Sequence, residues 1–453
     1  MARRQKGTTE KEQGNGGEVS RRRFIATAAA GTAGLAGILA SGRAPAFAQV
    51  RELRLLTWSH FIPASDRELK RQAEEWGQQT RTKVTIDTAP HLQLPAKKAA
   101  EATAQAGHDI ILLYSGDPDL YFDHVVDVSD LAQEIGGKLG GWYNAEDFLY
   151  RGVWKALPWY LITWPIAYRT DVLEKVGEKV PDTWEDFYRV GKKAKAIGHP
   201  IGIAISHCDD ANFQLRCLMW GYGASYVAKD GTTVTLNSPQ TVEAIEFMKR
   251  FFKDAQDPEV VSWDDSHNNR CLEAGKCFAI VNPSSAYESA KDKKIKIPGT
   301  ERLIHEVIDH TLPPRGPVRR ATTGQYNLLG IWKFSKNIDA AKDFLRFHYA
   351  EAQQDRFIAE SRGYNMPFLQ KMSNHPIWGT NPKYKFAKEI MRYTHPPGWP
   401  GPQTDASQLV MDLYLIPDMF AFAVTGRMST KDAIAWAEKE IAEVHAGRKK
   451  RQT

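Results

Sequence analysis

The sequence has few of the features that support catalysis or hold a metal. Its four cysteines follow no Cys-x-x-Cys spacing, so it encodes no zinc ribbon and no dithiol redox motif. The signatures of P-loop nucleotide binding, serine hydrolases, zinc proteases and dinucleotide binding are also missing. We therefore expect no metal, no cofactor and no catalytic residues.

A large excess of charge of one sign is missing from most of the chain. Of its 60 basic and 54 acidic side chains, eight basic and three acidic ones lie in residues 1–48, so the remaining 405 residues carry 52 against 51. Proteins that bind nucleic acid through its phosphates need a marked excess of lysine and arginine. The balance excludes a dedicated nucleic-acid binder. A body with 42% hydrophobic and 25% charged residues is instead expected to be globular, with two or three cores.

Long apolar runs are confined to the N-terminus. A polar stretch leads to Ser20-Arg21-Arg22-Arg23-Phe24-Ile25, then to a charge-free run over residues 24–42 and to Ala46-Phe47-Ala48. This order is typical of a secretory leader, and its alanine, glycine and threonine content disfavours a retained membrane anchor. The adjacent arginines resemble a twin-arginine signal, which exports folded proteins. We expect residues 1–48 to be a signal peptide that is cleaved after Ala48, and a periplasmic mature protein.

Export also affects the cysteines, because disulfides persist outside the cytoplasm. The sequence leaves two interpretations open. One disulfide could form, for example between Cys208 and Cys217, or Cys208, Cys217, Cys271 and Cys277 could be four small buried thiols.

From residue 50, short apolar strands alternate with helices. The pattern predicts strands over residues 53–57, 83–87 and 109–114 with helices over 66–79 and 92–106 between them. This order is typical of an α/β domain with a parallel sheet. A second α/β block is predicted from a strand at 166–168, a helix that Thr183 caps, and a strand at 201–205. Further helices are expected over residues 239–253, 340–349, 406–422 and 430–444.

Polar and aromatic side chains follow two of these strands. Trp58 and His60 come after the first strand, and Tyr114 ends the strand at 109–114. Ligands of parallel sheets bind beyond the carboxyl ends of the strands. We therefore expect Trp58, His60 and Tyr114 to face a ligand. The alternatives are that Trp58 is part of the core and that His60 makes a structural hydrogen bond.

Four stretches occur in a characteristic order along the chain. They are residues 152–160 leading through 165–171 to 181–187; residues 272–280; residues 312–317 with 324–331 and 335–347; and residues 425–434. Together with the leader, they make the sequence similar to the periplasmic solute-binding proteins of ABC importers, the group that includes the maltose- and other sugar-binding proteins.

The resemblance implies a two-lobed α/β fold of the type II periplasmic-binding-protein class, with the ligand in a cleft between the lobes. With the proline and glycine cluster at residues 311–317, it predicts an N-lobe of residues 49–160 plus 312–350 and a C-lobe of residues 161–311 plus 351–453. It also implies a protein that is not an enzyme and that delivers a small solute to the membrane subunits of an ABC permease.

The resemblance adds further ligand contacts to those at the strand ends. It implies roles for Trp159 and Tyr160 at the hinge, for Asn282, Ser284 and Tyr326 after later strands, and for Trp399 in a rigid proline and glycine loop. We expect Trp58 and Trp399 to be aromatic platforms on opposite lobes, although the segment around Trp399 could be only a turn. The dense polar cluster at residues 263–270 is interpreted as a helix cap that also supplies Asp265 or Asn268.

The expected contacts are mostly neutral, which favours an uncharged carbohydrate or polyol. A polyamine or another charged solute is the alternative, for which the chain offers the carboxylates Asp117, Asp119, Asp209, Asp210, Asp264 and Asp265. An exported enzyme acting on glycosides is a further alternative, but no residue pair supports it, because adjacent acids such as Asp264 and Asp265 point in different directions.

The leader yields a first prediction. Replacing Arg21 and Arg22 by lysine should leave an uncleaved precursor in the cytoplasm, because the twin-arginine pair is what the export machinery recognises. Immunoblots of periplasmic and cytoplasmic fractions measure this. Unchanged secretion would instead indicate the general secretory route.

Overall fold

The chain separates into the segment Met1–Arg51 and the unit Glu52–Thr453. The computed structural model describes residues 51–449, so the fold is that of the second unit. The expected signal peptide and its cleavage site after Ala48 lie outside the described residues.

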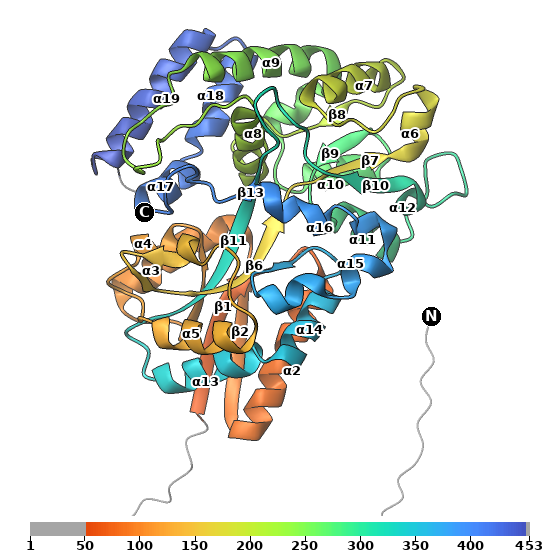
Figure 1. The fold of residues 1–453 in the computed structure, drawn as a ribbon. Helices are drawn as coiled ribbons and strands as arrows, with labels where there is room; N and C mark the ends of the chain where they lie inside the picture. The colour runs from red at the N-terminus through yellow and green to blue at the C-terminus, as the bar shows by residue number, and fades with distance from the viewer. Residues whose placement is uncertain (1–50, 450–453) are drawn as a thin grey trace, which may run out of the picture. The chain divides into compact units, whose positions relative to one another are not determined.

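A mixed sheet forms the centre of the first lobe, in the lower half of Figure 1. Within residues 51–449 its strands follow the order β12-β6-β11-β3-β1-β2, and β13 pairs with β11. Strands β1 and β3 are parallel, as predicted, whereas β11 runs antiparallel to both β3 and β6. The bounds are β1 Arg51–Trp58, β2 Thr82–Ala89, β3 Ile110–Tyr114, β6 Leu157–Thr163, β11 Thr322–Ile331, β12 Met366–Pro367 and β13 Thr394–His395.

Amphipathic helices cover this sheet. Helix α2 (Pro63–Thr80) buries Leu69, Ala73 and Trp76, which lie on one face. The Trp76 indole donates a hydrogen bond to Asp343 of α13 (Ile338–His348) at 3.0 Å, so α13 packs on the first lobe. The other helices of this lobe are α3 Leu94–Ala104, α4 Asp117–Leu120, α5 Ser129–Lys138 and α14 Glu351–Glu360.

A smaller sheet forms the centre of the second lobe, in the upper half of Figure 1, with the strand order β10-β7-β9-β8. The predicted cap of α7 is confirmed, because the Thr183 hydroxyl accepts from the Asp186 amide at 3.0 Å within a capping box. The strands are β7 Ile166–Arg169, β8 Ile201–Gly202, β9 Ala279–Val281 and β10 Ile308–Thr311; the helices include α7 Trp184–Ala196, α8 Asp209–Gly221, α9 Pro239–Ala255, α10 His267–Glu273, α11 Ser285–Asp292, α17 Asp405–Asp412, α18 Leu415–Val424 and α19 Thr430–His445.

The chain returns to the second lobe later than residue 350, where the sequence placed the boundary. Helix α14 packs on α2, and β12 pairs with β6, so residues 351–367 lie with the first sheet. The cause is the buried face of α14: the Phe357 ring stacks on Trp159 at 5.2 Å, and Gln353 accepts from Arg71. These contacts require the tertiary structure, and the sequence near residue 350 has no proline or glycine to mark them.

Two predicted elements differ in extent. The strand predicted over 201–205 ends at Gly202, because side-chain amides then replace the ladder: Gln256 donates to the Ile203 carbonyl and Gln214 accepts from the Ala204 amide. The helix predicted over 406–422 is divided into α17 and α18 by Tyr414, whose φ is 53°. The stretch Asp405–Val424 is apolar and long enough to span a bilayer, but 56% of its apolar window is buried within the protein.

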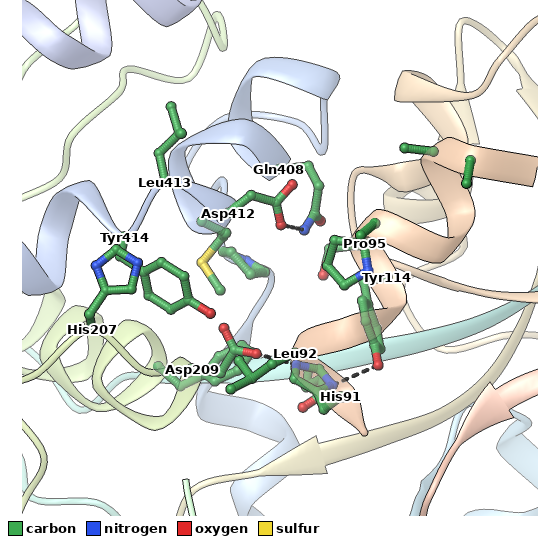
Figure 2. A pocket seen from close by; sticks show the side chains of 18 of the residues that line it. His91, Leu92, Pro95, Tyr114, His207, Asp209, Gln408, Asp412, Leu413 and Tyr414 are labelled. Atoms are coloured by element: carbon green, nitrogen blue, oxygen red, sulfur yellow. Dashed lines mark hydrogen bonds and ion pairs between the residues drawn. The ribbon is translucent and has the colours of Figure 1, made fainter. Parts of the chain in front are cut away.

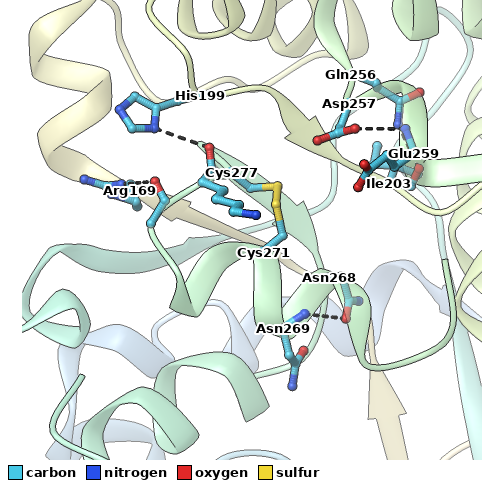
Figure 3. Close-up of a disulfide and its surroundings, with 12 residues drawn as sticks. Arg169, His199, Ile203, Gln256, Asp257, Glu259, Asn268, Asn269, Cys271 and Cys277 are labelled. Atoms are coloured by element: carbon cyan, nitrogen blue, oxygen red, sulfur yellow. Dashed lines mark hydrogen bonds between the residues drawn. A yellow bond between two sulfur atoms is a disulfide. The ribbon is translucent and has the colours of Figure 1, made fainter. Parts of the chain in front are cut away.

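The structure resolves the alternatives for the cysteines. A disulfide joins Cys271, in α10, to Cys277, just before β9 (Figure 3). Cys208 and Cys217 are buried and free, so the pairing of these two that the sequence allowed does not form.

The loop that crosses between β10 and β11 rests directly on the backbone of α8. A Cβ atom added at Gly316 would lie 2.2 Å from the Gly221 carbonyl oxygen, and the Val318 amide donates to that same oxygen at 3.0 Å. Both groups are main chain, so neither can move aside as a flexible side chain would.

Gly316→Ala should therefore lower the free energy of unfolding by about 1–3 kcal/mol, the usual range for overpacking. Urea denaturation followed by circular dichroism measures this. Gly137→Ala is the matched control, since nothing lies within 4 Å of its added Cβ and alanine is preferred in helices such as α5. Equal stability of the two variants would contradict the close approach.

Candidate functional site

Two adjoining cavities lie where the lobes meet. The larger has a volume of about 810 Å³ and the smaller about 350 Å³. Five residues line both cavities: His91, Leu92, Asp209, Phe213 and Gln325. We call the two together the cleft. The volume of each cavity lies in the range of sites that bind small molecules.

The first lobe contributes the carboxyl ends of its strands, as the sequence predicted. Trp58 ends β1 and Ser59 follows it, and both line the smaller cavity, whereas Tyr114 ends β3 and Ser115 follows it, and both line the larger one. His91 comes from the loop after β2 and lines both. Parallel strands bring these ends to one edge, which explains why residues so distant in sequence meet.

The second lobe contributes mainly acids and amides. Asp209 and Asp210 begin α8, Asp265 precedes α10, and Asn282 follows β9. All four line the smaller cavity. The turn between α17 and α18 supplies Tyr414 to the larger cavity, opposite Pro95 and Tyr114 (Figure 2).

An ion pair connects the lobes across the cleft. His91 Nε2 of the first lobe binds Asp209 of the second, while His91 Nδ1 lies 2.6 Å from the Tyr114 hydroxyl (Figure 2). Burial opposes the charge on His91, but the Asp209 carboxylate outweighs burial and raises the histidine pKa. In the same way, burial is outweighed by His91, which lowers the pKa of Asp209. The pair therefore favours the closed arrangement when both groups are charged.

Two further acids crowd Asp209. Asp265 accepts a hydrogen bond from the Asp210 amide at 2.9 Å. Burial, followed by repulsion from Asp265, raises the pKa of Asp210 well above its ordinary value. Burial and repulsion from Asp209 raise the pKa of Asp265 to about 6. We call Asp209, Asp210 and Asp265 the acid cluster.

A network of amides holds the acid cluster from behind. Asn268 donates to Asp210 and, at 3.1 Å, to Asn282, and Asn282 donates to Asn269 at 2.7 Å. Asn268 and Asn269 lie in the first turn of α10, and the disulfide joins the last turn of that helix to the chain before β9 (Figure 3). The disulfide therefore helps to fix the amides.

Four of the expected site residues line the cleft: Trp58, Tyr114, Asp265 and Asn282. Two more lie directly behind its wall. Asn268 holds Asp210 and Asn282, and Ser284 is fully buried, with its hydroxyl 3.4 Å from the Arg362 carbonyl. Trp58 is also part of the core, because its indole donates to the Tyr160 hydroxyl at 2.5 Å.

Four other expected residues lie in the core of the first lobe, outside the two cavities. His60 Nε2 lies 3.0 Å from the Asn365 oxygen, and burial lowers its pKa to about 4. Trp159 stacks on Phe357, which also packs against Tyr160. Tyr326 donates to Asp147 at 3.3 Å. Side chains alternate along a strand, so Tyr326 points away from the face where its neighbour Gln325 lines both cavities.

Trp399 does not line either cavity, contrary to the expected platform. Its ring stacks on His395 at 4.2 Å and meets Trp220 edge to face at 5.3 Å. The guanidinium of Arg319 covers it at 5.2 Å. The ring is thus held between other side chains, and within the described loop only Pro397 reaches the larger cavity.

Sequence reasoning missed His91, Phe213 and Gln325, and it considered Asp209 and Asp210 only for a polyamine. The two aspartates had a local signal in the sequence. Both lie in the first turn of α8, and acidic side chains stabilise helix N-termini. His91 and Gln325 had no comparable local signal, since each depends on the other lobe or on strand alternation.

The comparisons with known proteins agree with this architecture. The model of the bacterial extracellular solute-binding protein family matches residues 63–355, well over half of the chain. The chain belongs to this family. A Deinococcus radiodurans protein named as an ABC transporter-binding protein is 22% identical over 66% of this chain and 72% of its own length. A binding protein of Brucella abortus is 23% identical over 55% of this chain and 60% of its own.

Solved structures show the same two-lobed fold. A maltose-bound protein of T. maritima, MalE3, matches with a TM-score of 0.74 and 21% identity over 86% of this solute-binding protein and 98% of the other chain. A sugar transporter of Arthrobacter chlorophenolicus with bound laminaribiose matches with a TM-score of 0.74 and 17% identity, over 87% of this chain and 99% of its own. A solute-binding protein of Agrobacterium radiobacter in complex with ribitol matches with a TM-score of 0.70 and 17% identity, over 87% of this chain and 98% of its own.

The interlobe ion pair predicts a pH-dependent closure of this solute-binding protein. The pKa of His91 is raised when the lobes are in contact. Its contribution to the stability of that contact is therefore complete below about pH 6.5 and is lost as pH rises through the raised pKa. The pKa of Asp209 is lowered in the same contact. Its contribution to the stability of the contact is therefore complete above about pH 3.9 and is lost as pH falls through the lowered pKa. Ligand-free protein should therefore be most compact between about pH 4 and 6.5 and should open as pH rises through the raised pKa of His91.

Small-angle X-ray scattering across pH 4–9 measures the radius of gyration. His91→Gln keeps a hydrogen-bonding side chain without the charge, so its compactness should vary less with pH. A pH profile identical to that of the unsubstituted protein would exclude the pair as a latch between the lobes.

Proposed function

We propose that this protein captures a small carbohydrate or polyol in the cleft and delivers it to an ABC permease, without making or breaking a bond. The observation that carries the proposal is the cleft itself: aromatic rings and hydrogen-bonding groups from both lobes line two adjoining cavities. The bound maltose, laminaribiose and ribitol of the structural neighbours support this solute class.

The walls suit the two surfaces of a sugar or polyol. Trp58, Trp164, Phe213 and Tyr364 line the smaller cavity and offer apolar faces to C–H groups. The Gln325 and Asn282 amides and the acid cluster can accept or donate hydrogen bonds to hydroxyl groups. A polar ligand that loses its water in the cleft thus finds replacement partners.

Closure would report occupancy to the permease. A ligand that contacts both lobes stabilises the closed form by its preference for that form. The closed form then presents a surface made by both lobes to the membrane subunits. The leader of residues 1–48 would place the mature protein in the periplasm through the twin-arginine machinery, where this capture takes place.

A thermal-shift screen of the mature protein tests the proposal. A ligand that binds the folded state at 100 times its dissociation constant stabilises it by about 2.7 kcal/mol. We expect members of a panel of sugars and polyols to raise the melting temperature. Stabilisation by putrescine or spermidine alone would contradict a carbohydrate ligand, and turnover of a glycoside would contradict a binding protein.

The cavity mouth yields a further prediction. Phe61 lines the smaller cavity, yet its side chain is 40% exposed. Phe61→Ala should weaken binding of the sugar identified by the screen about three- to tenfold, because an apolar face is lost, while the melting temperature changes little. Isothermal titration calorimetry measures the affinity. Leu149→Ala, at a residue that is 46% exposed and lines neither cavity, is the control. Equal affinities of the two variants would remove Phe61 from the site.

A further inference from the structure

The cleft has an acidic lining. Among the described residues that line the two cavities, none is lysine or arginine. The smaller cavity nevertheless has the complete acid cluster in its wall, and Asp209, Asp210 and Asp265 are all largely buried. Buried carboxylates without cationic partners are costly, so a positive charge is expected to be supplied from elsewhere.

We propose that the captured solute is a sugar or cyclic polyol that carries a protonated amino group, and that this ammonium group binds at Asp210 and Asp265 in the smaller cavity. The inference rests on the proposed function, because it specifies the class of solute that the same cleft takes.

The protein's own groups neutralise only part of the acid cluster. His91 is the histidine that faces it, and its Nε2 is already engaged by Asp209. Asp210 receives neutral donors, from the Asn268 amide and from the Trp164 indole at 3.4 Å. Asp265 receives the backbone amide of Asp210. Two carboxylates therefore remain without a cation.

A metal ion is a poorer occupant than an ammonium group. Within the described part of the chain, no group of three or more histidine, cysteine or acidic side chains is placed to hold a metal. The walls beside the acid cluster are aromatic instead: Trp164 and Phe213 stack at 4.1 Å and both line the smaller cavity. Aromatic faces attract ammonium groups and cover the carbon skeleton attached to them.

A second acceptor independently points to a ligand rich in donors. Gln325 is only 7% exposed, and its amide nitrogen donates to Asn327 at 3.1 Å. This fixes the amide, and its oxygen has no hydrogen-bond partner among residues 51–449, although the side chain lines both cavities. The oxygen can accept from a hydroxyl or ammonium group that lies between the cavities.

The placement of the acids favours one amino group on a ring over a linear polyamine. A linear diamine needs acids at two separated ends, whereas Asp210 and Asp265 are neighbours that share a hydrogen bond. In the larger cavity, Asp412 already accepts from the Gln408 amide at 3.0 Å. The flat rings around the smaller cavity match a cyclic skeleton better than an extended chain.

Binding of an ammonium group should release protons. The raised pKa values of Asp210 and Asp265 mean that part of the acid cluster is protonated near pH 6, and a cation favours the ionised form. Affinity should therefore rise with pH between about 5 and 7. The other titratable groups that face the acid cluster are His91, Asp264, Tyr114, Tyr364, Tyr414 and Cys208.

The test uses matched pairs of probes that differ only in the amino group. The mature protein is titrated calorimetrically with glucosamine, galactosamine and mannosamine, and with glucose, galactose and mannose. We expect at least one amino sugar to bind tenfold or more tightly than its neutral parent, with proton release that appears when buffers of different ionisation enthalpy are compared. Its N-acetyl derivative, which has no charge, should bind as weakly as the parent.

Variants locate the charge. Asp265→Asn and Asp210→Asn should each reduce the preference for the amino sugar over its parent about tenfold and should diminish the proton release. Glu259→Gln makes the same change of charge at an exposed site of the same lobe and should leave the preference intact. The preference is a ratio of two affinities, so a general structural defect would not change it in this way.

Each remaining outcome contradicts one of the proposals. Neutral parents that bind as tightly as their amino sugars would overturn the ammonium site but leave carbohydrate capture standing. A preference that survives both aspartate substitutions would also overturn the site. Binding of putrescine without any sugar, or of no probe in the panel, would contradict carbohydrate capture as well.

Discussion

The antiparallel pairing of β6 with β11 is the constraint on which the rest of the structure depends. Both strands run through the centre of the first sheet and both adjoin the second lobe, β6 through the connection to β7 and β11 through the connection from β10. Because Gln325 lies on β11 at this junction, the same pairing that joins the lobes places a binding group in both cavities. The pairing of β6 with β11 therefore determines both where the cleft lies and how the lobes are connected.

Much of the fold could be predicted, because its signals are local. An uninterrupted apolar strand such as β3, a helix face such as that of α2, and the Thr183 cap each depend on residues within one or two turns of one another. The edge on which Trp58 and Tyr114 lie also followed, since parallel strands align their carboxyl ends. The break at Tyr414 was not predicted, because an ordinary residue there takes the left-handed conformation, although Pro417 in the first turn of α18 is a local signal for a helix start.

The site itself was predicted less well, and the reason is distance along the chain. His91 and Asp209 are 118 positions apart and belong to different lobes, so no spacing rule relates them. Several aromatic residues were predicted to contact the ligand but line neither cavity. Trp159, Tyr326 and Trp399 have the chemistry of a sugar platform, but each ring is held by other rings or a cation of the protein. Aromatic identity indicates burial at least as strongly as it indicates binding.

Asp209 belongs to both the interlobe ion pair and the acid cluster, and this double membership makes the position of a ligand's charge important. The contact between the lobes places the positive charge of His91 against Asp209, which leaves Asp210 and Asp265 as the carboxylates without a cation. A cation that bound Asp209 would displace His91 and oppose closure, because the contact between the lobes would be lost. A cation that bound Asp210 and Asp265 would instead lower the repulsion that Asp209 experiences from its neighbours. The same charge therefore promotes or prevents closure according to which aspartate it meets, so selection among charged solutes can occur at the closing step as well as at first contact.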